Sequence, residues 1–246
     1  MNIPIAAPPW TTLGRKLESL CRKALYAFDM VQGVEKVGIA LSGGKDSLTL
    51  LYLLKAISGR GFPPFSLHAF HVSGEFSCGS SLAGHFLQKI CNELSIPLTI
   101  LPSTQTKETL ECYSCSRERR KLIFDAAKEH SITTIAFGHH RDDSIQTLLM
   151  NLFHKAEFAA NLPKIPMHAY GVTIIRPLIF MAEQEIKEFA KLYGFARITC
   201  QCPVGQTSLR KKTEKLLSDL EEVFPHIRTN LSQASFTYAS DKALKQ

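Results

Sequence analysis

The feature that most constrains the fold of this chain is a short polar run between two apolar segments. The run is Ser42-Gly43-Gly44-Lys45-Asp46-Ser47, and residues 37–41 before it and 48–54 after it are almost entirely apolar. This order predicts a buried strand, a tight glycine turn and a helix. Adjacent glycines let the backbone approach an anion, and the helix N-terminus adds N–H donors and partial positive charge. The junction is therefore suited to holding a phosphate chain.

The side chains of the run support the same interpretation. Ser42 and Ser47 can donate hydroxyl hydrogen bonds, and Lys45 supplies a positive charge. Asp46 would be repelled by a polyphosphate unless it caps the helix or binds a metal, so it suggests that Mg²⁺ arrives with a nucleotide. An ordinary strand-to-helix turn with a Ser or Asp cap is the simpler alternative, and the six residues in this order favour phosphate binding over it.

The run is neither the Walker A pattern nor G-x-G-x-x-G. It resembles the signature loop of the PP-loop ATP pyrophosphatases. That resemblance implies cleavage of ATP between its α- and β-phosphates, with adenylylation of a substrate atom.

Predicted strands and helices alternate along the rest of the chain. We expect strands at residues 37–41, 65–72, 97–101, 133–137 and 172–175, and helices at 11–32, from the polar run to about 59, and at 81–94, 116–129, 142–153, 183–193 and 207–222. This alternation predicts an α/β fold, a doubly wound parallel five-stranded sheet with helices on both faces, in which ligands bind at the carboxyl ends of the strands. Residues 154–171, with Pro163 and Pro166, are predicted to form the longest loop and to contact substrate.

The length of 246 residues suits one large domain, which we place at residues 33–205, with an N-terminal helical segment at 1–32 and a C-terminal one at 206–246. With 29 basic and 22 acidic side chains, the net charge of +7 fits a polyanionic partner. No apolar run reaches membrane-spanning length, and the proline-containing start carries no basic residue, unlike a secretory signal. The seven cysteines are an odd number, so we expect reduced thiols and a cytoplasmic location without membrane association.

A second polar motif, Gly138-His139-His140-Arg141-Asp142-Asp143, directly follows the predicted strand at 133–137. Gly138 permits close approach to a nucleotide, the His and Arg side chains can contact phosphate or a base, and the two aspartates can cap the next helix. A polar loop before a capped helix is the alternative. Together with the first run, this motif resembles the tRNA-thiolating branch of the PP-loop superfamily. Gln146 stands where that branch usually has Glu, and its amide still offers one oxygen ligand.

Four cysteines call for a separate explanation. Cys112 and Cys115 have C-x-x-C spacing before a predicted helix, and Cys200 and Cys202 follow much later in the chain. Four thiolates could bind zinc, three could hold a [4Fe-4S] cluster with one iron open, or the thiols could be unrelated. Cys21 and Cys91 fall in apolar helical patterns and are predicted core residues. Cys78, in a Gly/Ser-rich segment, has no assignment.

The cysteine pattern resembles the iron–sulfur-dependent tRNA 2-thiocytidine synthetases and, more broadly, their thiouridine relatives, over roughly residues 13–228. The resemblance implies that Cys112, Cys115 and Cys200 bind a [4Fe-4S] cluster, with Cys202 competing as the third ligand. It implies that ATP and Mg²⁺ bind through residues 42–47 together with Gly138, His139 and Asp142. The catalytic residues that it implies are Lys45, Asp46, Cys112 and Cys115.

The implied substrate is tRNA, thiolated at C2 of a pyrimidine, with cytidine 32 as the first choice. The basic residues beside the cysteine motifs are expected to contact RNA phosphates; they are Arg119, Arg120, Arg210 and Lys211. A cysteine desulfurase or free sulfide would donate sulfur, and a homodimer is an open option for assembly. The alternatives are a 2-thiouridine synthetase, a lysidine-type PP-loop ligase, and a zinc-stabilised RNA-binding protein without catalysis.

Overall fold

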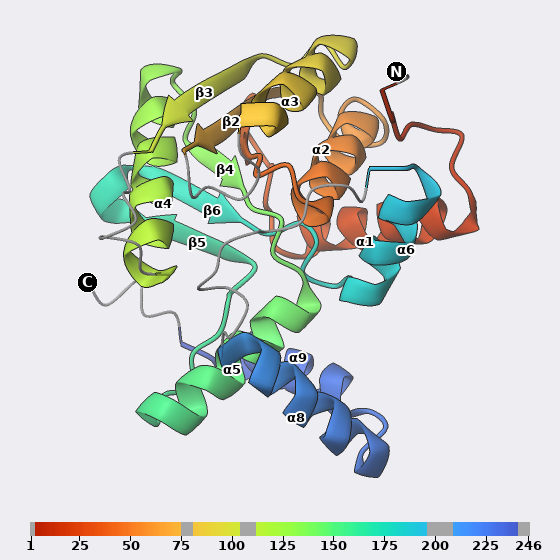
Figure 1. Cartoon of the computed structure of the whole chain (residues 1–246), viewed down its shortest axis with the longest axis vertical. Coiled ribbons are helices and arrows are strands. Elements are labelled where there is room, and N and C mark those ends of the chain that lie inside the picture. The colour runs from red at the N-terminus through yellow and green to blue at the C-terminus, as the bar shows by residue number, and fades with distance from the viewer. Residues whose placement is uncertain (1–2, 75–80, 104–111, 196–208, 241–246) are drawn as a thin grey trace.

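The fold is built on one six-stranded sheet, seen in a computed structural model that describes residues 3–74, 81–103, 112–195 and 209–240 (Figure 1). The strands are β1 (Lys36–Ala40), β2 (Ser66–Ser73), β3 (Leu98–Pro102), β4 (Thr134–Ala136), β5 (Lys164–Met167) and β6 (Val172–Ile175). Their spatial order is β3-β2-β1-β4-β6-β5. Five strands are parallel, as predicted, and β5 is an added antiparallel strand beside β6.

The prediction of one long loop at residues 154–171 is wrong in part, because β5 and a short 3₁₀ turn, His168–Tyr170, lie within it. Gly171 closes the turn with a φ of +63°, and Met167 then pairs with Val172. Pro166 lacks an N–H donor, but an edge strand tolerates it because one side of the strand needs no partner. Four residues including a proline carry too little alternation to reveal a strand.

The described helices are α1 (Thr12–Ala27), α2 (Lys45–Ile57), α3 (Ser81–Glu93), α4 (Cys112–Glu129), α5 (Arg141–Lys155), α6 (Glu183–Leu192), α8 (Leu209–Val223) and α9 (Ile227–Tyr238). None of them is long and apolar enough to cross a membrane. Two boundaries differ notably from expectation. Helix α1 ends five residues earlier than predicted, before Asp29 with its left-handed backbone (φ 47°), and α4 begins at Cys112 rather than Ser116.

The sheet is covered on both faces because its strands alternate buried side chains between them. Val37 and Ile39 of β1 belong to the core cluster shared with α1, α2, α3 and α6. Phe70 and Val72 of β2 belong to a second cluster, shared with α4 and with β4, β5 and β6. The parallel, doubly wound fold is therefore confirmed.

Helices α8 and α9 do not cover the sheet. They pack against α5, below the sheet in Figure 1, with Ile145, Leu149 and Leu217 as the buried centre of the contact. Sequence analysis places helical structure in this C-terminal segment but does not separate α9 from α8.

The strand order reverses between β1 and β4. The chain passes from β1 outward to β2 and β3, then returns to β4 on the other side of β1. Val37 pairs with Thr134 and Ile39 with Ala136, so both strands end at the same edge. In open α/β sheets, the carboxyl ends of such strands form the usual ligand crevice.

Candidate active site

The first polar run forms the loop between β1 and α2, and its two serines shape it. Gly43 has a φ of +86°, which favours glycine, and its N–H donates to Ser47 Oγ at 3.1 Å. Gly44 N–H donates to Ser42 Oγ at 3.3 Å, and Ser47 Oγ donates to the Gly44 carbonyl at 3.0 Å. The hydroxyls of Ser42 and Ser47, which are predicted to donate hydrogen bonds, thus form hydrogen bonds within the loop in this structure.

Helix α2 begins at Lys45 without a side-chain cap. Its N-cap is Gly44, which has no side chain to accept a hydrogen bond from the first-turn N–H groups. The simpler alternative, a turn closed by a Ser or Asp cap, is therefore wrong. The N-terminal N–H groups and their partial positive charge instead face the edge where β1 and β4 end. This is an arrangement that suits a phosphate group.

The second motif touches the first through Gly138. A Cβ atom at this position would lie 3.0 Å from Asp46 C and 3.0 Å from Ser47 N. A larger residue would force these backbone atoms apart by a few tenths of an ångström, so glycine suits the close approach of the β4–α5 loop to the first turn of α2. The close approach predicted for Gly138 is thus made to the first loop itself, and it holds the two motifs together.

Lys45 lies between two carboxylates. Its Nζ atom is 3.0 Å from Asp46 Oδ2 and 3.1 Å from Glu183 Oε1, at the start of α6. Burial alone would lower the pKa of Lys45, but the two carboxylates raise it above its ordinary value. Burial alone would raise the pKa of Glu183, but the hydrogen bond from Lys187 and the contact with Lys45 lower it. Lys45 is therefore charged and fixed in place at neutral pH.

Asp46, like Arg141 with its buried and unpartnered Nε among the described residues, has a polar atom that calls for an outside partner. Its Oδ1 atom is buried and has no hydrogen-bond partner among the described residues. The nearest ring nitrogen is His140 Nε2, at 3.8 Å, beyond hydrogen-bonding distance. A buried carboxylate oxygen without a donor is costly, and a hard cation such as Mg²⁺ would satisfy it.

His140 is the N-cap of α5 and is almost fully buried. Its ring Nδ1 accepts from the backbone N–H of Asp143 at 3.4 Å, while the backbone N–H of His140 donates to Asp143 Oδ2 at 3.1 Å. Because Nδ1 accepts, Nε2 is the ring nitrogen that can donate, and it lies 3.4 Å from Asp143 Oδ2 and 3.8 Å from Asp46 Oδ1. The two motifs therefore meet at a histidine–carboxylate contact.

His139 lies against Arg176, which follows β6. The Arg176 Nε–H donates to His139 Nδ1 at 3.4 Å, and the imidazole stacks on Phe137 with ring centroids 5.8 Å apart. Burial, helped by the Arg176 charge, lowers the pKa of His139 to about 3. His139 is therefore neutral at physiological pH, with Nε2 as its hydrogen-bond donor.

Asp142 and Asp143 face the C-terminal helices. Asp142 Oδ2 accepts the Glu183 N–H at 2.7 Å, and its Oδ1 pairs with Arg228 Nη1 of α9 at 3.0 Å. Asp143 Oδ1 pairs with Arg210 Nη1 of α8 at 2.7 Å. Asp142, predicted to bind the nucleotide, and Arg210, predicted to contact RNA, thus both contact other protein side chains.

The sequence analysis missed Glu183, Arg176 and Arg228. Glu183 is expected there only as the first residue of a helix, and neither arginine lies in a motif. Their importance arises from contacts between distant segments, for which the local sequence offers no signal.

Of the four cysteines, the structure describes the C-x-x-C pair in part. Cys112 and Cys115 occupy the first turn of α4 rather than the segment before it, and Cys115 is half-buried. Cys200, Cys202 and Cys78 lie outside the described residues, as do any contacts among them. The core prediction for Cys21 and Cys91 is confirmed, since both are fully buried.

The remaining RNA candidates lie on two helices. Arg119 and Arg120 are half-exposed on α4, and Arg120 Nε donates to the Ser116 carbonyl at 3.2 Å. Lys211 is exposed on α8. No described contact engages the Lys211 side chain in an ion pair, so its charge faces solvent.

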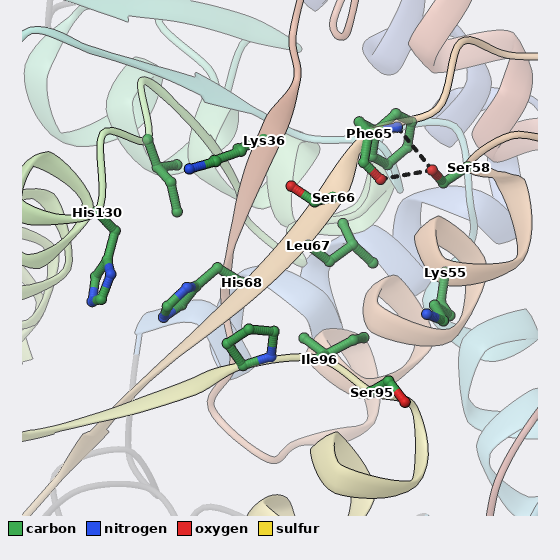
Figure 2. Close-up of a pocket in the computed structure, with 12 residues that line it drawn as sticks. Lys36, Lys55, Ser58, Phe65, Ser66, Leu67, His68, Ser95, Ile96 and His130 are labelled. Atoms are coloured by element: carbon green, nitrogen blue, oxygen red, sulfur yellow. Dashed lines mark hydrogen bonds between the residues drawn. The ribbon is translucent and has the colours of Figure 1, made fainter.

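A cavity of about 530 Å³ lies at the opposite edge of the sheet, where the strands begin (Figure 2). Lys36, His68 and His130 line it, together with residues that follow α2 and α3. Both helices end there, and the partial negative charge of a helix C-terminus opposes a phosphate. The carboxyl edge, not this cavity, is therefore the candidate nucleotide site.

A largely parallel α/β sheet with a glycine loop and an uncapped helix N-terminus at its switch point is typical of nucleotide-binding proteins. The family model described as the PP-loop domain matches residues 11–199. Three relatives named tRNA-cytidine(32) 2-sulfurtransferase are similar over most of the chain. The protein from Coxiella burnetii is 35% identical over 232 residues (89% of this chain, 88% of that one), and that from Geobacter metallireducens is 30% identical over 227 residues (89% and 88%). The protein from Stenotrophomonas maltophilia is 34% identical over 224 residues (87% and 73%).

The chain thus belongs to the PP-loop family and, within it, to the group of the tRNA-cytidine(32) 2-sulfurtransferases. A solved structure, the U34-tRNA thiolase NcsA from Methanococcus maripaludis with its [4Fe-4S] cluster, shares the fold. It superposes with a TM-score of 0.75 at 24% identity, covering 95% of this chain and 85% of that one.

Proposed function

We propose that this protein uses ATP to replace the C2 oxygen of cytidine 32 in tRNA with sulfur. The observation that carries the proposal is the buried Asp46 Oδ1, which accepts no hydrogen bond from the described residues, beside the uncapped N-terminus of α2. This arrangement suits a polyphosphate with a bound cation. The tRNA substrate and the base are inferred from the names of the relatives. The acceptor atom and the cluster are parts of the proposal that go beyond family membership.

The binding role falls to the two motifs at the carboxyl edge. The N–H groups at the start of α2 and the charged Lys45 hold the phosphates of ATP. His139, neutral at physiological pH, offers its Nε2–H to the nucleotide without adding a charge. Mg²⁺ bound at Asp46 Oδ1 would offset the negative charge of the phosphates.

The reaction follows from this placement. The C2 oxygen of the base attacks the α-phosphorus, the bond from that phosphorus to the bridging oxygen breaks, and pyrophosphate leaves. Lys45 stabilises the charge that develops on the phosphates. A sulfur nucleophile then attacks C2, and AMP leaves with the original oxygen.

The cysteines Cys112, Cys115 and Cys200 would hold a [4Fe-4S] cluster, with Cys202 as the competing third ligand, and the open iron of the cluster would hold the sulfide that the donor delivers. The helix N-terminus at the C-x-x-C pair favours thiolates, which metal ligation requires. A cysteine desulfurase or free sulfide is the proposed donor. Arg119, Arg120 and Lys211 are the proposed contacts to tRNA phosphates.

The test is the nucleoside content of tRNA from cells that lack the gene. Mass spectrometry should show that 2-thiocytidine is lost and that the wild-type gene restores it. Asp46→Asn should fail to restore it, whereas Asp219→Asn, a matched change of an exposed carboxylate on α8, should succeed. Loss of a thiouridine instead would contradict the proposed base, and restoration by Asp46→Asn would remove Asp46 from the mechanism.

The cluster has a separate test in the protein purified without oxygen. We expect a brown protein with about four irons per chain. Cys115→Ala should lose the iron, and Ser116→Ala should retain it. One tightly bound zinc in place of iron would contradict the cluster.

A further inference from the structure

We propose that Arg228 and Arg210, on the two C-terminal helices, are positioning residues of the nucleotide site. Each arginine pairs with one of two adjacent aspartates. Each aspartate in turn accepts the backbone N–H of a residue, Glu183 or His140, whose side chain faces the β1–α2 loop. The inference rests on the proposed binding of ATP to residues 42–47. It assigns α8 and α9 a part in setting the geometry of that loop.

The first arm runs from α9 through α6. Arg228 Nη1 lies 3.0 Å from Asp142 Oδ1, and Asp142 Oδ2 accepts the Glu183 N–H at 2.7 Å. Glu183 Oε1 then lies 3.1 Å from Lys45 Nζ. The Asp142 side chain is 6% exposed and that of Arg228 12%, so little solvent screens their contact. Losing the guanidinium would leave the buried Asp142 carboxylate with only its longer contact to Arg141 Nη2, at 3.6 Å, and would loosen the start of α6.

The second arm runs from α8 through α5. Arg210 Nη1 lies 2.7 Å from Asp143 Oδ1, while Asp143 Oδ2 accepts the His140 N–H at 3.1 Å. His140 Nε2 lies 3.8 Å from Asp46 Oδ1. The Arg210 side chain is 44% exposed, so solvent weakens this ion pair and we expect the smaller effect here. The two arms end on adjacent loop residues, Lys45 and Asp46.

Arg228 also makes contacts that do not lead to the loop. Its Nη2 lies 2.8 Å from Glu214 Oε1 and its Nε 2.8 Å from Glu221 Oε2, both on α8. These pairs join α9 to α8. A purely structural role for Arg228 predicts that breaking them matters as much as breaking the contact with Asp142. A positioning role predicts that only the Asp142 contact affects the nucleotide.

The experiment compares Arg228→Gln with the double variant Glu214→Gln/Glu221→Gln in the full-length protein. The double variant breaks the α8–α9 pairs and leaves the Asp142 pair intact. We expect Arg228→Gln to weaken ATP binding and raise the KM for ATP by about tenfold or more, within the usual 5–150-fold range of coupled sites. The double variant should change the affinity for ATP and the KM for ATP by less than about twofold. Both variants should lower the melting temperature. The KM for tRNA should not change in either variant.

Two further variants keep the test decisive. Arg228→Lys keeps a charge beside Asp142 and should recover part of the ATP affinity. Arg210→Gln breaks the half-exposed pair, and should weaken ATP binding by a smaller factor even if Arg228→Gln does not fold. Equal effects of Arg228→Gln and the double variant would overturn the positioning role while wild-type ATP binding upholds the proposed function. Absence of ATP binding by the wild type would overturn both.

Discussion

Replacing Gly138 with alanine tests whether the two loops must touch. The new Cβ would lie 3.0 Å from Asp46 C, 3.0 Å from Ser47 N and 3.2 Å from Asp46 O. Carbon contacts are most favourable at about 3.5–4.0 Å, and all three neighbours are backbone atoms that cannot rotate away. Gly138 is not at a positive φ, so the backbone conformation itself adds no strain. The cost therefore comes from the overlap alone.

An extra methyl group in a packed site costs about 1–3 kcal/mol. Taking about 2 kcal/mol, and roughly 2–4 °C per kcal/mol for a chain of this size, Gly138→Ala should lower the melting temperature by about 4–8 °C. It should also weaken ATP binding, because any relief of the overlap moves the second motif away from α2. Calorimetry measures both quantities.

Gly44→Ala is the matched control for stability, since Gly44 itself lies in the proposed ATP-binding loop. Its Cβ would meet only Ser42 Oγ, at 3.5 Å, and the φ of −72° suits alanine. The melting temperature should stay the same or rise slightly, because alanine restricts the unfolded chain. If Gly138→Ala left both stability and ATP affinity unchanged, the close packing of the two loops would not matter and the reasoning would be refuted.

Three further predictions concern buried polar groups. Thr49 Oγ1 is buried with no hydrogen-bond partner among the described residues, so Thr49→Val should raise the free energy of unfolding by about 1 kcal/mol; a loss of stability would contradict this. Because the pKa of His139 lies near 3 in the folded protein against an ordinary 6.5, stability should fall as pH drops from 6.5 toward 3, by at most about 1.4 kcal/mol per pH unit. His139→Gln should lose less stability than wild type between pH 7 and 5 in denaturant titrations, and equal losses would argue against the neutral state of this half-buried ring. Gln146 Nε2 donates to Glu214 Oε2 at 2.8 Å, so Gln146→Glu should destabilise the protein by about 1 kcal/mol and Glu214→Gln should reverse this in a double-mutant cycle; additive effects would exclude the contact.

The parallel core of the fold could be predicted from sequence because each strand is a buried apolar run followed by a helical pattern. The location of the candidate site could be predicted from sequence for the same reason. Residues 42–47 and 138–143 each come directly after such a strand, and carboxyl ends of parallel strands meet at one edge. The helix after the first run begins at Lys45, close to where the polar residues placed it.

The remaining features depend on contacts between distant segments. Asp142 and Asp143 are adjacent and alike in sequence, and only the positions of Arg228 and Arg210 show that both face the C-terminal helices. Glu183 pairs with Lys45 across more than a hundred residues, and no local pattern marks it. Strand β5 was hidden by its proline and its length.

Gln146 shows how such contacts explain a departure from the family pattern. It stands where the resemblance leads one to expect Glu, yet its amide donates to a carboxylate on α8. A second carboxylate at this position would face Glu214 at hydrogen-bonding distance. The amide is therefore matched to the helix that packs beside it.

The measurement that tests the proposed function most directly is thiolation of tRNA by the purified protein. The protein, prepared without oxygen, would be incubated with tRNA lacking the modification, sulfide and ATP, and the nucleosides and AMP quantified by mass spectrometry. Our account predicts that 2-thiocytidine and AMP form in equal amounts and that neither forms without ATP. Formation of 2-thiocytidine without ATP, or of AMP without any thiolated base, would contradict it.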